Sequence, residues 1–171
     1  LIPRIGASPG RSPLNRIERA LPLTDDEKTR QSEALDTIAS SKLKIDTTAD
    51  VTMDYIQRTA VRQAQSEDGL DFIIVDYLQL ISGVSKKSGT REQEVSEVSR
   101  RMKILAKELN VPVMVLVQLN RESAQEEDHT PQLFHIRESA AIAMNSNVVI
   151  LIDRKVDKDT EVIDPKATFI I

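Results

Sequence analysis

Three apolar runs mark the strands expected in the second half of the chain. They are Phe72–Val75, Val111–Val117 and Val148–Ile152. The first two runs show no polar alternation, which is typical of strands covered on both faces in the middle of a parallel sheet. Asp76 and Gln118 directly follow these two runs. Ligands of open α/β sheets bind outside the carboxyl ends of the strands, so both residues are expected at a functional edge if the two strands are neighbours.

Amphipathic helices are expected before and between the runs. Thr24 and Glu27 have capping-box spacing, which predicts a helix that continues to about Ser40. A second helix is expected over Thr52–Gln65. The strongest pattern lies in residues 91–109, where apolar side chains recur at spacings of three and four.

The order of these elements predicts the fold class. Leu43–Asp46 is interpreted as a further short strand, and Ala167–Ile171 as the start of another. Strands therefore alternate with helices that are long enough to serve as crossovers between parallel strands. The sequence predicts an α/β domain with a doubly wound, mostly parallel sheet flanked by helices.

Composition narrows the possible functions. The chain has 171 residues, of which 40% are hydrophobic, so it is most simply one domain. It contains no cysteine, which excludes disulfides and thiolate metal sites. A net charge of −4 argues against binding nucleic acid through bulk charge, and with no tryptophan a platform of stacked bases is not expected. Any DNA contact should be a local phosphate contact. No apolar run is long enough to cross a bilayer, so a soluble protein without membrane contact is expected. The absence of cysteine fits a cytoplasmic protein.

The two strand-end residues allow two interpretations each. An aspartate after an apolar strand is what nucleotide hydrolases use to hold Mg²⁺ through water. The alternative for Asp76 is a side-chain hydrogen bond that caps the following turn. Gln118 could likewise be a strand-end cap.

Four motifs together resemble a known family. They are Asp71–Ile81, Arg91–Arg100, Gln118–Arg121 and Ile136–Ser139, and their order and sequence are similar to successive motifs of the DnaB-type replicative DNA helicases. The clearest similarity covers residues 70–153. The resemblance implies a RecA-like motor domain in a homo-hexameric ring that hydrolyses ATP while it moves on single-stranded DNA. It also implies a primase and a helicase loader as partners.

The resemblance assigns roles to individual residues. Asp76 matches the Walker B aspartate, which would hold Mg²⁺ through water, and Gln118 matches the glutamine that senses the γ-phosphate of ATP. Arg137, Glu138 and Ala140 match the central-channel loop that contacts the DNA backbone. The alternative for Arg137 and Glu138 is an exposed ion pair that contributes less than about 1 kcal/mol.

The sequence departs from the family pattern in two ways. Ala140 stands where the family usually has glycine, which would be costly if that position needed a positive φ. No Gly-x-x-x-x-Gly-Lys-Ser/Thr motif occurs in the chain. In the family this P-loop would lie upstream of Leu1 and the arginine finger beyond Ile171. We therefore expect a single partial domain, truncated at both ends, that is inactive by itself.

Two other functions stay open on the sequence alone. A RecA-like recombinase or clock-type ATPase would share the fold without unwinding DNA. A non-catalytic assembly module could have kept the sheet and lost the P-loop.

Overall fold

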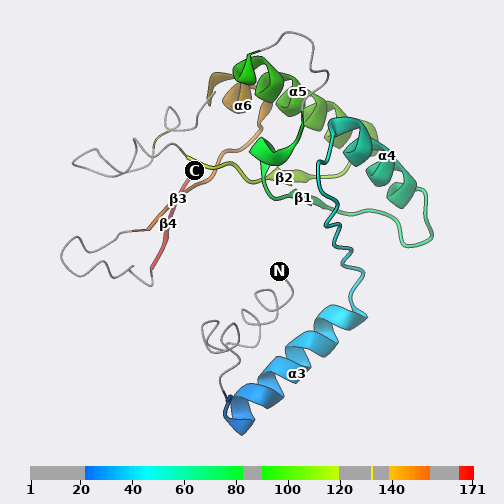
Figure 1. Ribbon diagram of the computed structural model, residues 1–171, viewed down its shortest axis with the longest axis vertical. Helices are drawn as coiled ribbons and strands as arrows, with labels where there is room; N and C mark the ends of the chain where they lie inside the picture. The colour runs from blue at the N-terminus through cyan, green and yellow to red at the C-terminus, as the bar shows by residue number, and fades with distance from the viewer. Residues whose placement is uncertain (1–21, 83–89, 120–131, 133–138, 155–165) are drawn as a thin grey trace, which may run out of the picture. The chain divides into compact units, whose positions relative to one another are not determined.

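The computed structural model describes residues 22–82, 90–119, 132, 139–154 and 166–171. The chain separates into two units, residues 1–47 and residues 48–171. Helices and short strands alternate through the middle of the described part, which begins with two helices and ends with two strands (Figure 1). In chain order the elements are α3 (Asp25–Ser40), α4 (Met53–Ala64), β1 (Ile73–Val75), the 3-10 helix η1 (Leu78–Leu80), α5 (Arg91–Leu109), β2 (Val113–Val115), α6 (Ser139–Asn145), β3 (Leu151–Asp153) and β4 (Thr168–Ile170).

The first unit contains α3, which begins as the sequence predicts. The Thr24 hydroxyl accepts a hydrogen bond from the Glu27 N–H at 3.3 Å, and the Glu27 carboxylate accepts one from the Thr24 N–H at 2.8 Å. This capping box satisfies two N–H groups that the first helical turn leaves free. The strand expected at Leu43–Asp46 is wrong, because this segment joins neither of the two sheets among the described residues. Its short alternating pattern is local, whereas a strand exists only through pairing with a neighbour.

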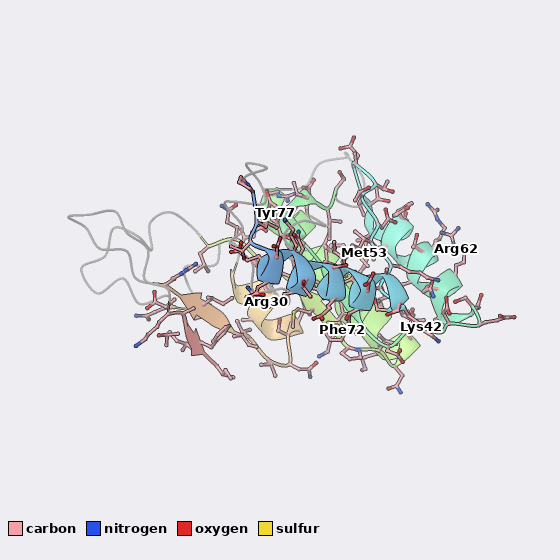
Figure 2. The ribbon with its side chains drawn as sticks, turned by 90° about the horizontal axis from the view of Figure 1, so that it is seen from below. Arg30, Lys42, Met53, Arg62, Phe72 and Tyr77 are labelled. Carbon is pink, nitrogen blue, oxygen red and sulfur yellow. The ribbon has the colours of Figure 1, made fainter. Side chains whose placement is uncertain are left out.

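In the second unit, α5 has the predicted limits, and α4 is one residue shorter at each end than predicted, because Thr52 and Gln65 are its caps. The Thr52 hydroxyl caps α4 by accepting from the Tyr55 N–H at 3.2 Å. A second capping box, between Thr90 and Gln93, starts α5. Asn110 ends α5 with a left-handed φ of 53°, a conformation that asparagine tolerates well. Figure 2 shows α4 with its labelled side chains, Met53 at its first residue and Arg62 near its end.

The hydrophobic core of the second unit forms around α5. Leu105 is 1% exposed, and Met53 from α4 is exposed to the same small extent. Ile142 of α6 and Leu151 of β3 join the same cluster. Complete burial of one such side chain contributes about 1.5–3 kcal/mol to the free energy of unfolding. The other buried members come from α4, η1, the residue after η1 and α5. They are Ala60, Leu78, Ile81, Val95, Val98 and Met102.

The strands form two separate pairs among the described residues. β1 and β2 are parallel, with Ile73 opposite Val113 and Val75 opposite Val115. β3 and β4 are antiparallel, with Leu151 opposite Ile170. The α/β class is confirmed. The first two strands are neighbours, which meets the condition for a shared edge at Asp76 and Gln118. The continuous doubly wound sheet stays a prediction.

Only one face of the β1–β2 pair is covered in the described part of the chain. Val75 and Val115 are half-buried and pack against the core cluster. Ile74 is 60% exposed and Met114 is 47% exposed. The prediction of two covered faces is therefore not met by the described residues, since α4 and α5 lie on the same side of the pair (Figure 1). No helix among the described residues is long and apolar enough to span a membrane.

Candidate functional site

The candidate site lies where β1 and β2 end. Their hydrogen bonding continues past the strand limits, because the Leu116 N–H donates to the Val75 carbonyl at 2.9 Å and the Leu78 N–H donates to the Leu116 carbonyl at 2.9 Å. Asp76 and Gln118 therefore leave two paired parallel strands at their carboxyl ends. In an open α/β sheet this edge is where ligands bind.

Asp76 presents an exposed carboxylate. The peptide between Asp76 and Tyr77 is cis, and Tyr77, the residue before η1, makes no side-chain capping bond. Within the described residues the Asp76 carboxylate accepts no hydrogen bond. The capping alternative for Asp76 is therefore not realised in this part of the chain, and its oxygens are available to a ligand.

A single carboxylate is compatible with a hydrated magnesium ion. Mg²⁺ keeps several waters and is commonly held by one or two carboxylates together with substrate phosphates. No group of three or more acidic, histidine or cysteine side chains that could enclose a metal occurs in the described ranges. The donor set around Asp76 thus suits an ion that arrives with a nucleotide.

Gln118 is held by its backbone, and its side chain is exposed. Its N–H donates to the Gln79 Oε1 atom at 3.4 Å, and its carbonyl accepts from the Gln79 Nε2 atom at 3.2 Å. The side-chain carboxamide of Gln118 caps no strand or turn among the residues that the structure describes. The capping role belongs to Gln79, which the sequence analysis missed because no spacing rule marks a glutamine in a turn after a strand.

Arg91 connects this edge to α5. Its Nη2 atom donates to the Gln79 carbonyl at 2.7 Å. Its Nη1 atom pairs with the Glu94 carboxylate at 2.9 Å, within the first turn of α5. The start of the long helix is therefore tied to the turn that follows Asp76.

The residues expected to contact DNA are only partly described. Arg137 and Glu138 lie outside the described residues, while Ala140 is exposed and is the second residue of α6. Positive φ angles at non-glycine residues occur, in the described part, at Asp50 and Asn110. Ala140 has helical backbone, so the cost considered for replacing a glycine of positive φ does not arise here.

Ion pairs between and along the helices support the scaffold. The guanidinium of Arg101 on α5 pairs with the Asp54 carboxylate of α4 and donates to Gln57 at 3.1 Å. Within α5, Arg100 contacts Glu97 at 2.8 Å. The hydrogen bond from Arg100, together with the positive charges of Arg100 and Arg101, lowers the pKa of Glu97 against a smaller opposing effect of burial.

A family model and two curated relatives of this chain all belong to the DnaB-like and replicative DNA helicases. The family model described as the DnaB-like helicase C-terminal domain matches residues 1–171. The chain is 38% identical over 141 residues to the replicative DNA helicase DnaC of Bacillus subtilis, which covers 81% of this chain and 31% of that protein. It is 42% identical over 132 residues to the replicative DNA helicase DnaB of Mycobacterium intracellulare, which covers 77% of this chain and 23% of that protein. The chain thus spans less than a third of the length of these relatives.

Two solved structures share the fold. One of them, described as an ATPase domain, superimposes with a TM-score of 0.80 at 24% identity, covering 99% of this chain and 64% of that one. The other, a DnaB-like replicative helicase described with its interactions with primase, superimposes with a TM-score of 0.82 at 22% identity, covering 99% of this chain and 44% of that one. The chain has the fold of these two structures, which is consistent with the expected RecA-like architecture.

Proposed function

The chain belongs to the DnaB-like helicase C-terminal domain family, and we propose that it is part of the motor of an ATP-dependent replicative DNA helicase. In the complete protein this motor translocates on single-stranded DNA and unwinds the duplex. The observation that carries the proposal is the edge at which Asp76 and Gln118 leave two paired parallel strands. The similarity to replicative helicases over most of the chain supports it.

Asp76 and Gln118 have different roles at the nucleotide. The exposed Asp76 carboxylate orients water molecules around Mg²⁺, and the ion supplies neutralisation of charge on the β- and γ-phosphates. The Gln118 amide donates to a phosphate oxygen or accepts from water. Because Gln118 stands at the end of β2, loss of the γ-phosphate shifts this strand end and the segment that follows it.

Other parts of the machinery are proposed from the family. The phosphate-cradling P-loop motif does not occur in residues 1–171. We propose that the strands of the domain form one doubly wound, mostly parallel sheet. Arg137 supplies positive charge to the DNA backbone, and Glu138 and Ala140 contribute to the same contact region. Six copies form the ring, with a primase and a helicase loader as partners, and one solved relative is described with a primase.

The experiment that tests this function uses the longest polypeptide that contains this chain. ATP hydrolysis is measured with and without single-stranded DNA, followed by strand displacement on a forked duplex. The proposal predicts DNA-stimulated turnover and displacement. Stimulated turnover without displacement would favour a recombinase-like or clock-type ATPase. Absence of turnover from a polypeptide that contains a P-loop would favour an assembly module.

A further inference from the structure

The Gln79 side chain extends the pairing of β1 and β2. After Val75 the chain turns away from β2, and the last backbone bond between the two segments joins the Leu78 N–H to the Leu116 carbonyl at 2.9 Å. Gln118, two residues further along, is instead met by the carboxamide of Gln79, which accepts at 3.4 Å and donates at 3.2 Å. A carboxamide offers the same donor and acceptor as a peptide group, so it substitutes for the missing strand residue.

The backbone of Gln79 is itself well fixed. Its neighbour Leu78 is 3% exposed in the core cluster, and Ile81, the residue after η1, is equally buried. The Gln79 carbonyl accepts from Arg91 at 2.7 Å, and Arg91 is held in turn by Glu94. One residue therefore connects the end of β2, the turn after Asp76 and the first turn of α5.

The two carboxamide bonds are suited to being broken and remade. They join neutral groups, their lengths are at or beyond the long end of the usual range, and both residues are at least partly exposed. The bond between Arg91 and the Gln79 carbonyl is charge-assisted and shorter. Gln79 therefore stays joined to α5 through Arg91, while formation or loss of the two carboxamide bonds changes the restraint that Gln118 places on Gln79.

We propose that Gln79 is a positioning residue that fixes the strand end carrying Gln118 and transmits its movement to α5 through Arg91. The inference rests on the proposed function, since it gives Gln118 the nucleotide-sensing role. It extends that function by naming the group that couples the sensor to the long helix.

The test uses three single variants, Gln79→Leu, Gln79→Glu and Gln118→Ala, and the double variant that combines Gln79→Leu with Gln118→Ala. All four are made in the longest polypeptide that contains this chain. Leucine removes both carboxamide bonds at similar size, whereas glutamate keeps the acceptor and loses the donor. The readouts are the kcat and KM for ATP with and without single-stranded DNA. Gln65→Leu, an exposed glutamine at the end of α4, is the matched control.

If Gln79 couples Gln118 to α5, its variants should change kcat and not the KM for ATP. Gln79→Leu lowers DNA-stimulated kcat by about tenfold to a hundredfold, the scale of a small misplacement of a catalytic group, and leaves the KM for ATP nearly unchanged. Gln79→Glu has a smaller effect in the same direction. The double variant loses no more than Gln118→Ala alone, because the two residues act as one unit.

Three outcomes would overturn the inference. Normal DNA stimulation in folded Gln79→Leu or Gln79→Glu, while Gln118→Ala is impaired, would overturn the role of Gln79 and leave the proposed function intact. Additive losses in the double variant would show that Gln79 acts independently of Gln118. Full DNA-stimulated activity of Gln118→Ala would remove the sensor, and with it both the inference and this part of the proposed function.

Discussion

The two faces of the β1–β2 pair have opposite surroundings. On one face Val75 and Val115 pack against a cluster that includes Leu105, which is 1% exposed. On the other face Ile74 and Met114 are about half exposed, at 60% and 47%. In each strand, neighbouring apolar residues of one run point to opposite faces. The composition of the run therefore does not reveal which face contributes to stability. Within the described residues, the helix side holds the strand pair in place and the other side is open.

The largest predicted effect concerns the covered face. Leu105→Ala should lower the free energy of unfolding by about 2–5 kcal/mol, because it leaves a cavity under the strands. Met114→Ala, on the open face of β2, should cost less than about 1 kcal/mol, since surface changes away from the core are usually small. Urea denaturation of the two variants measures the difference. Equal costs would show that the open face is buried as deeply as the helix side.

A smaller effect is expected at the start of α5, the helix that covers the strands. The Thr90 hydroxyl accepts from the Gln93 N–H in the capping box. Thr90→Ala should lower the free energy of unfolding by about 1 kcal/mol, while Thr90→Ser, which keeps the hydroxyl, should be nearly neutral. Thermal unfolding of both variants checks this. If the serine variant were as unstable as the alanine variant, the cap would not be the cause.

Arg137→Ala should weaken DNA binding without changing the stability of the core around α5. Loss of one phosphate contact should weaken single-stranded DNA binding and reduce the slope of log affinity against log salt by about 1. The free energy of unfolding should change by less than about 0.5 kcal/mol. Titrations at several salt concentrations measure the slope. An unchanged slope would return Arg137 to the role of an exposed ion-pair partner.

The smallest effect concerns the outer surface of α5. Arg100 lowers the pKa of Glu97 below its usual value of 4.5, so ionised Glu97 stabilises the folded chain above that pH. This contribution is lost as the pH falls through the lowered pKa. Glu97→Gln should remove only about 0.2–0.5 kcal/mol at neutral pH, since the pair is exposed to solvent and screened by it. Denaturation at pH 7 and pH 3 should show a weaker pH dependence in the variant; an identical dependence would contradict the assignment.

Local signals in the sequence were sufficient for α3, α4 and α5. The spacing of Thr24 and Glu27 predicts a capping box that the structure contains, and the apolar stripe of residues 91–109 predicts α5. A mostly parallel sheet was also predicted, and β1 and β2 pair in parallel, although their adjacency was only a condition in the sequence analysis. These features depend on neighbours three or four residues apart, or on strands joined by one helical crossover.

The features that the sequence did not reveal depend on long-range contacts. The segment Leu43–Asp46 has a strand-like composition and pairs with no described strand. The open face of β1 could not be distinguished from a covered one by composition. The bonds from Gln79 to Gln118 join residues 39 positions apart. The roles of Asp76, Gln118, Arg137, Glu138 and Ala140 in nucleotide and DNA binding stay predictions.

We propose that the edge of the β1–β2 pair is the nucleotide site. This proposal is tested most directly by ATP hydrolysis of Asp76→Asn in the longest polypeptide that contains this chain, with Asp71→Asn as the control. Both aspartates are exposed and flank β1, but only Asp76 follows its carboxyl end. We predict that Asp76→Asn abolishes Mg²⁺-dependent turnover with little change in thermal stability, while Asp71→Asn stays active. Retained turnover in Asp76→Asn would contradict the account and remove Asp76 from the metal site.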